Sequence, residues 1–346
     1  MLINNFIEKI AKDSKTVIAD NSIYKIKLIN KINKLLQNKD LQPIISKKLL
    51  DLRNWSGTYS EILMISFLKD FDFPINLEKN IPREQTLMGI NSHALPDIYL
   101  DSPYNLYFEV KRFSGVNKEL TDNIIREVKK STCVWNIVAN YQYDSFFNKA
   151  SLAKKEIKEL EDAIEKGLSH HNSINYPNLS YTIHKEKKDM TYSVHSHNPY
   201  RFAEQFKYYV FNHADQILKE RSNILSFVLS PKFNYEFTNL FDAHIGLRSL
   251  ARRVFMELIN DNRKIYELND KWGNCEIHLS NIAKRITAIV FYIDGLDETD
   301  KVYFFQNPNV HKDNQELVGI KQLKMSIDYK KTDIDFYYDN FEFDNY

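Results

Sequence analysis

The chain has 346 residues but only eight glycines, whereas average usage of about 7% would give roughly 24. The two closest glycines, Gly273 and Gly295, are 22 positions apart. A G-x-G-x-x-G loop, a Walker A loop and a G-x-S-x-G elbow are therefore all absent. This composition argues against dinucleotide-dependent oxidoreductases, P-loop NTPases, protein kinases and typical α/β-hydrolases. If the protein handles phosphate, it must do so with side chains or a metal ion.

Length and cysteine usage indicate a protein that folds without disulfide bonds. A chain of this size suits one large domain or two ordinary ones. Cys133 and Cys275 are too far apart to read as a redox or zinc pair. The N-terminal segment is interrupted by charged residues, unlike a signal peptide, and no apolar run reaches the roughly 18 residues of a membrane span. We therefore expect a cytoplasmic protein with no membrane partner.

The net charge of +1 is unevenly distributed along the chain. Residues 1–60 carry eleven Lys and Arg against five Asp and Glu, a balance of +6. Residues 290–346 carry six Lys against twelve Asp and Glu, a balance of −6. A basic head and an acidic tail are compatible with a polyanion partner, although an ordinary solvated surface explains them as well.

The N-terminal region is predicted to be helical. Residues 22–37 predict a basic amphipathic helix whose lysines lie mostly opposite its apolar face. That face is expected to contain Ile23, Ile26, Ile29, Ile32 and Leu36. A second helix is predicted to begin near residues 56–58 and to run through residue 71, with Pro74 closing it from outside.

Residues 96–101 and 105–111 predict two short strands joined by a turn-like segment at 102–104. In the second strand, alternation places Leu106, Phe108 and Val110 on one face. Glu109 and Lys111 then lie together on the opposite face.

The remaining chain predicts alternating helices and strands. Helices are expected at 118–130, 149–166, 200–221 and about 240–260, and strands at 132–139, 223–230, 285–293 and 301–305. Residues 180–185 and 191–197 alternate like a hairpin. The tail from residue 333 has five acidic residues, no basic residue and many aromatic residues, which suits an edge strand, a docking peptide or a disordered segment.

The segment from Pro96-Asp97 to Glu109-Val110-Lys111 carries the chemistry. Adjacent strands bring Asp97 and Glu109 close together, and the preceding helix can deliver Glu61 from the side. Converging carboxylates bind Mg²⁺, which polarises a phosphate and lowers the pKa of a bound water. A lysine two residues further along the strand can orient that water or stabilise developing negative charge.

This arrangement resembles the PD-(D/E)XK nuclease superfamily, whose restriction-endonuclease-like fold has an α-β-β-β-α-β core. The resemblance implies an α/β protein with a mixed central sheet flanked by helices. It implies that Asp97 and Glu109 bind Mg²⁺, for which Mn²⁺ can substitute, with Glu61 as an auxiliary carboxylate ligand. It also implies that Lys111 positions the attacking water.

In many members a helix and a strand follow the active-site hairpin, and residues 201–230 resemble this pair. Gln216 lies where several members carry a glutamine near the site. A shorter alternative uses the helix at 118–130 and the strand at 132–139, but residues 223–230 form the better buried strand. We therefore expect a basic helical region at 1–54, a nuclease core at 55–235 with a helical and hairpin insertion at 112–199, and an α+β region at 236–346.

The implied activity is hydrolysis of phosphodiester bonds by a metal-dependent endonuclease, with DNA preferred over RNA. Restriction or antiviral defence is an expectation drawn from the family. The alternative is a non-catalytic nucleic-acid-binding or assembly subunit with the same fold. A homodimer or a protein partner bound through the C-terminal region is a further expectation.

Simpler interpretations exist for the individual residues. Asp97, Glu109 and Lys111 also suit a strand pair with outward-facing charges. Thr58 and Glu61 have the spacing of a capping box, in which Glu61 would bind a backbone N–H at the start of its helix. Gln216 also suits a solvated helix face.

Overall fold

The computed structural model describes residues 2–14, 22–77, 79–89, 93–94, 96–113, 116–141, 150–176, 179–186, 198–219, 222–229, 240–268, 272–295, 299–310, 315–330, 334–342 and 344. The chain forms two compact units. The first comprises residues 1–113, 213–238 and 281–346, and the second comprises residues 114–212 and 239–280. This division differs from the three predicted regions, because the N-terminal helices and the C-terminal strands share a unit with the hairpin at 96–111.

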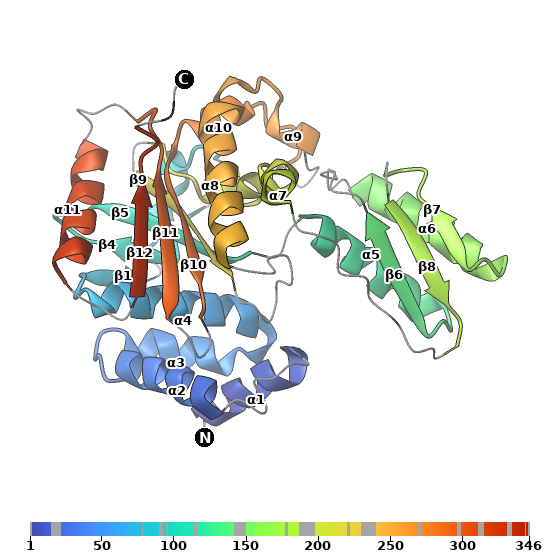
Figure 1. Ribbon diagram of the computed structural model, residues 1–346, viewed down its shortest axis with the longest axis horizontal. Helices are drawn as coiled ribbons and strands as arrows, with labels where there is room; N and C mark the ends of the chain where they lie inside the picture. Colours follow the sequence, from blue (N-terminus) through green and yellow to red (C-terminus); the bar gives the residue numbers. More distant parts are fainter. Residues whose placement is uncertain are drawn as a thin grey trace. The chain divides into compact units, whose positions relative to one another are not determined.

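The first unit is built on a mixed sheet with the strand order β1-β4-β5-β9-β10-β11-β12 (Figure 1). These strands are β1 (Ile75–Leu77), β4 (Ile98–Leu100), β5 (Leu106–Arg112), β9 (Ser222–Leu229), β10 (Ile286–Ile293), β11 (Asp300–Gln306) and β12 (Ile334–Asp339). The central strands β5, β9 and β10 run parallel. β1, β4 and β5 form an antiparallel meander, β11 is antiparallel to β10, and β12 is parallel to β11.

Helices cover the sheet face that carries Leu106, Phe108 and Val110. These residues belong to one buried apolar cluster with side chains of α4 (Trp55–Asp70) and α11 (Gln315–Tyr329). The helices α1 (Leu2–Ser14), α2 (Ser22–Leu36) and α3 (Gln42–Leu50) pack on one another and on α4, and Figure 1 shows α4 between them and the sheet. The predicted α/β fold with a mixed central sheet and flanking helices is confirmed.

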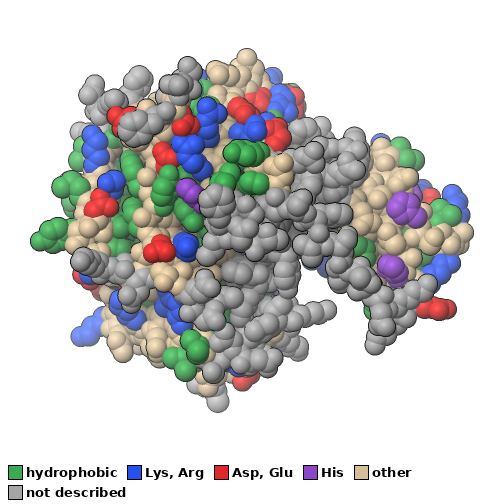
Figure 2. All heavy atoms as spheres, in the orientation of Figure 1, with side chains coloured by type: hydrophobic (Ala, Val, Ile, Leu, Met, Phe, Trp, Pro, Cys, Tyr) green, Lys and Arg blue, Asp and Glu red, His purple; other side chains and the backbone are tan. Residues whose placement is uncertain are grey.

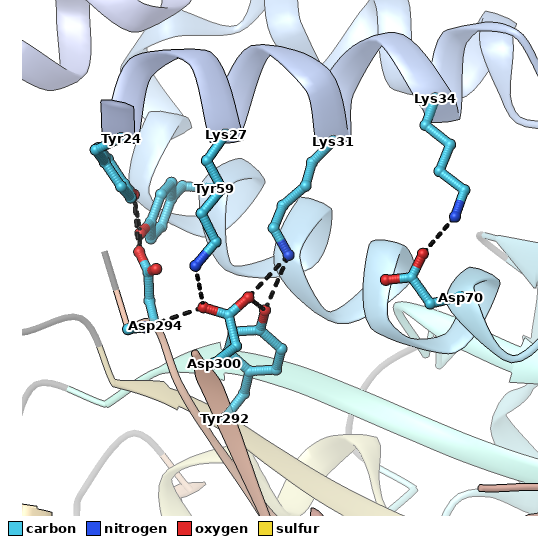
Figure 3. A network of polar contacts seen from close by, with 10 residues as sticks. Tyr24, Lys27, Lys31, Lys34, Tyr59, Asp70, Tyr292, Asp294 and Asp300 are labelled. Atoms are coloured by element: carbon cyan, nitrogen blue, oxygen red, sulfur yellow. Dashed lines mark hydrogen bonds and ion pairs between the residues drawn. The ribbon is translucent and has the colours of Figure 1, made fainter. Parts of the chain in front are cut away.

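The helix predicted at 22–37 is present as α2, and its buried face agrees with the predicted one only in part: Ile32 is buried, and Ile29 and Leu36 pack partly buried against the core. Ile23 and Ile26 are 64% and 57% exposed, whereas Tyr24, Leu28 and Ile32 are buried. The position of this face is set by residues far away in the sequence. Tyr24, Lys27 and Lys31 of α2 point toward two buried acidic residues, one directly after β10 and one at the start of β11 (Figure 3). Lys27 and Lys31 donate to Asp300 at 2.7 and 3.0 Å, and Tyr24 donates to Asp294 at 2.7 Å.

The basic head is therefore partly structural. Burial alone would raise the pKa of Asp300, but Lys31 and Lys27 outweigh this effect and hold that pKa at about 2. Lys34 of α2 forms a direct ion pair with Asp70 of α4. In Figure 2, basic and acidic side chains are interspersed over the described part of the face shown.

The second unit contains an antiparallel sheet with the order β6-β8-β7. Its strands are β6 (Asn136–Tyr141), β7 (His170–Asn172) and β8 (Leu179–His184), and helices α5 (Val116–Ser131) and α6 (Ala150–Glu165) share one apolar core with this sheet. The predicted partner of residues 180–185 was residues 191–197, which lie outside the described residues. In the structure β8 pairs with β6 and β7 instead.

The helix predicted at 200–221 is much shorter in the structure. α7 (Pro199–Phe206) ends after two turns, and the 3-10 segment η3 (Tyr209–Gln216) follows, with non-helical backbone angles at His213. A run of aromatic and β-branched residues between 208 and 213 has low helix propensity, and several of its side chains are buried. α8 (Leu240–Met256), which packs against α7, corresponds to the helix predicted at about 240–260.

The predicted tail is an edge strand over part of its length, because β12 pairs with β11. The remaining short elements are β2 (Ile81–Pro82), β3 (His93–Ala94), α9 (Ile265–Leu268), α10 (Leu279–Ala283) and the 3-10 turns η1 (Leu52–Asn54), η2 (Arg83–Gln85) and η4 (Leu258–Asn260). Among the described residues, no helix has both the length and the apolar character needed to span a membrane.

Candidate active site

The hairpin of β4 and β5 brings Asp97 and Glu109 to adjacent strands. Ile98 pairs with Phe108, so Asp97 lies one residue beyond this pair, beside the next residues of β5. Asp97 Oδ2 accepts a 2.7 Å hydrogen bond from the backbone N–H of Val110. The carboxylate of Asp97 is thus fixed by the backbone of the strand that carries Glu109.

Lys111 joins the two carboxylates. Its Nζ lies 2.7 Å from Glu109 Oε1 and 3.3 Å from Asp97 Oδ2. Strand alternation turns Glu109 and Lys111 to the same side of β5, as predicted, while Val110 faces the apolar core. Glu109 is buried, and its Oε2 has no hydrogen-bond partner within the described residues.

The acids of this cluster repel one another in a buried setting. Burial, together with the negative charges of Asp97 and Asp215, raises the pKa of Glu109 to about 8 against the opposing effect of Lys111. Burial would lower the pKa of Lys111, but Glu109 and Asp97 outweigh it and raise that pKa above its ordinary value. The carboxyl groups of Asp97 and Glu109 therefore share the ammonium of Lys111 in a largely buried setting.

Glu61 reaches the cluster from α4. Burial and the charge of Asp97 raise the pKa of Glu61, while Lys48 and Lys111 lower it. The capping-box interpretation of Glu61 is wrong, because α4 begins at Trp55 and its N-cap is Asn54. Thr58 therefore lies inside the helix, where its hydroxyl donates to the carbonyl oxygen of Lys48 at 3.4 Å.

Two site residues escaped the sequence analysis. Lys48, in the last turn of α3, lies 2.8 Å from Glu61 Oε2 through its Nζ, but the lysine-rich N-terminal segment gives it no distinguishing signal. Asp215 directly precedes Gln216 and acts electrostatically on Glu109. Gln216 itself is half-buried at the end of η3, and its role in the site stays a prediction.

The strand next to β5 limits the site on one side. β9 runs parallel to β5 with Glu109 opposite Leu225 and Lys111 opposite Phe227. The strand predicted at 223–230 is present as β9 (Ser222–Leu229) beside the hairpin, whereas the alternative strand predicted at 132–139 corresponds to β6, which belongs to the sheet of the second unit. The buried apolar side chains of β9 lower the local polarity around Glu109.

The donor set suits a hard divalent cation. Asp97, Glu109 and Glu61 supply carboxylate oxygens, which are the ligands that Mg²⁺ prefers. In the structure, however, Lys111 rather than a third carboxylate lies between Asp97 and Glu109. Among the described residues, no group of three His, Cys, Asp or Glu side chains is arranged to hold a metal ion.

Comparisons with known proteins add no assignment. No protein-family model, curated protein or solved structure matches this chain. The functional interpretation therefore depends on the residues of the site and on the order of the elements around them.

Proposed function

We propose that this protein is a metal-dependent nuclease that hydrolyses phosphodiester bonds, acting on DNA as an endonuclease. The observation that carries the proposal is the contact of Lys111 with both Asp97 and Glu109 on neighbouring strands. A buried carboxylate with a strongly raised pKa, here Glu109, is more common at functional sites than at structural ones.

The element order supports the same proposal. The core of the PD-(D/E)XK superfamily runs helix, three strands, helix and strand. In this chain α4, β1, β4 and β5 follow in that order, with the small β2–β3 pair inserted, and β9 lies parallel beside β5. The chain departs from the pattern between β5 and β9, where the second unit supplies α5, α6 and a short sheet instead of one helix.

The chemistry of the carboxylate oxygens supports a bound Mg²⁺ ion, which would have to draw the three side chains together. Glu109 Oε2 is a buried acceptor without a hydrogen-bond partner in the described part of the chain, and such an atom is costly unless a cation or donor compensates it. Asp97, Glu109 and Glu61 are the residues that would hold the ion. When bound, Mg²⁺ would polarise the phosphate and lower the pKa of a coordinated water.

The protein's own groups have separable roles in this proposal. The Lys111 ammonium is placed to stabilise negative charge that develops on the phosphate, or to orient the attacking water. Asp97 is already fixed by the N–H of Val110, so its carboxylate needs little reorganisation. Asp215 acts electrostatically on Glu109 from η3 and would adjust the polarity beside it, and the proposal assigns the adjacent Gln216 to the same side of the site.

The proposal is tested with purified protein on supercoiled plasmid, linear duplex, single-stranded DNA and single-stranded RNA, in Mg²⁺, Mn²⁺ or EDTA. We expect cleavage that needs metal and that falls at least about 100-fold in Asp97→Asn. The exposed Asp72, which pairs with Lys330, provides the control Asp72→Asn, which should retain activity.

The proposal fails if no substrate is cut with either metal, or if Asp97→Asn cuts as fast as the wild type. Binding of nucleic acid that persists in EDTA without turnover would favour the non-catalytic alternative.

A further inference from the structure

A second lysine contributes to the carboxylate cluster from the N-terminal helices. Lys48 Nζ lies 2.8 Å from Glu61 Oε2, and the two side chains are only 17% and 9% exposed. Ion pairs this well shielded from solvent are uncommon in proteins, since removing two charges from water is costly. In this chain the charges of Asp97 and Lys111 both act on Glu61, so the pair lies within electrostatic reach of the carboxylate cluster.

The backbone of Lys48, in α3, is held against α4, the helix that carries its partner Glu61. The Lys48 carbonyl accepts hydrogen bonds from the Thr58 hydroxyl at 3.4 Å and from the N–H of Asp51 at 3.2 Å. Thr58 and Glu61 are three residues apart, so they share one face of α4. The end of α3 is thus held against α4 at two neighbouring points, one through the Lys48 backbone and one through its side chain.

This geometry restricts the Glu61 carboxylate. Glu61 is buried, and the negative charge of Asp97 nearby disfavours its approach to the cluster. The Lys48 ammonium supplies the compensating attraction from the other side. If that charge is removed, the buried carboxylate loses its close counter-ion and can turn away from Asp97.

We propose that Lys48 is a positioning residue of the nuclease site, which holds the Glu61 carboxylate in place beside Asp97. This inference rests on the proposed function. It makes α3 part of the site, whereas residues 1–54 were expected to form a separate basic region. Because Lys48 contacts Glu61, its loss should affect turnover more than substrate binding.

The experiment compares Lys48→Met, Lys48→Arg, Glu61→Gln and the double variant Lys48→Met/Glu61→Gln. Lys47→Met is the matched control, because Lys47 is the preceding residue of α3 and is exposed. For each protein, kcat and KM for DNA cleavage are measured at saturating Mg²⁺, at a temperature well below its Tm. The Tm rise on adding Mg²⁺ alone is measured in parallel.

We expect Lys48→Met to lower kcat by about 10- to 100-fold, the usual loss when a group that orients a metal ligand is removed, with KM nearly unchanged. Lys48→Arg should recover most of this loss, and Lys47→Met should match the wild type. The double variant should be no slower than Glu61→Gln, because both changes act through one carboxylate. The Mg²⁺-induced Tm rise should be smaller in Lys48→Met than in the wild type.

The inference is overturned if kcat of folded Lys48→Met equals that of the wild type, which would leave Lys48 a purely structural role. It is also overturned if Lys48→Met raises KM and if the loss of activity in the double variant equals the product of the losses in Lys48→Met and Glu61→Gln. Lys48 would then contact the DNA itself. If Lys48→Met does not fold, Lys48→Arg and Glu61→Gln decide the question through their kcat and Tm rise. If the wild type cuts nothing, the proposed function fails, and an equal Mg²⁺-induced Tm rise in the wild type and Lys48→Met then separately overturns the role of Lys48.

Discussion

Replacing Glu109 by glutamine should raise the stability of the protein relative to the wild type by more at neutral pH than at acidic pH. Glu109 is buried, close to Asp97, and its pKa is raised from 4.5 to about 8. Between these two values the folded protein holds a proton that the unfolded chain releases. The free energy of unfolding of the wild type therefore falls as pH rises through this window.

The structure sets the size of the effect. Each pH unit between 4.5 and about 8 costs the wild type about 1.4 kcal/mol through this group. From pH 5.5 to pH 7.5 the expected cost is therefore about 2–3 kcal/mol. Glutamine does not titrate, so Glu109→Gln does not carry this cost. The variant should gain that amount relative to the wild type across the interval, without added metal.

The assay is urea unfolding followed by circular dichroism at both pH values, in EDTA. Glu127→Gln is the control, because Glu127 is exposed and pairs only with neighbours on its own helix among the described contacts. Its difference from the wild type should be the same at the two pH values, because Glu127, whose pKa is lowered, is ionised at both. A Glu109→Gln difference that is constant between the two pH values, or that shifts in favour of the wild type at pH 7.5, would refute the account of a strained buried carboxylate.

Two further predictions concern the scaffold that supports the site. Asp300→Asn should destabilise the protein by about 2–4 kcal/mol at pH 7 in urea melts, because Lys27 and Lys31 lose their shared counter-charge. The pKa of Asp300 is lowered to about 2, so its contribution to the free energy of unfolding is present above about pH 4 and is lost as pH falls toward 2. A cost of Asp300→Asn at pH 7 under about 0.5 kcal/mol would contradict this account. Gly319→Ala should cost about 3 kcal/mol, because the added Cβ would overlap the carbonyl group of Tyr104. Gly57→Ala is the control, because its Cβ would meet only the movable side chain of Asn54, and it should be neutral or slightly stabilising. Equal melting temperatures for the two variants would count against this close packing of α11 on the hairpin.

Local patterns were sufficient to predict the hairpin and the helix before it. The alternation of residues 105–111 predicted both the strand β5 and the shared face of Glu109 and Lys111, because strand periodicity depends only on neighbours in sequence. The apolar run at 223–230 likewise predicted β9. These elements contain most of the proposed site.

Long-range contacts explain what the sequence did not reveal. The buried face of α2 depends on Asp294 and Asp300, some 270 residues away, so helical periodicity alone wrongly placed Ile23 and Ile26 on that face. Lys48 has no local signature among many lysines, and it joins the site only because α3 ends against α4. A continuous helix at 200–221 gives Asp215 no distinguishing position. In the structure α7 ends at Phe206, and η3 (Tyr209–Gln216) carries Asp215 instead.

The central claim is that Asp97, Glu109 and Lys111 form a hydrolytic site, and the rate of plasmid cleavage by Lys111→Ala at saturating Mg²⁺ tests it most directly. The control is Lys155→Ala, an exposed lysine of α6. The account predicts that Lys111→Ala is at least about 100-fold slower than the wild type, while Lys155→Ala is unchanged. Equal rates for the wild type and Lys111→Ala, on plasmid and on single-stranded DNA, would contradict it.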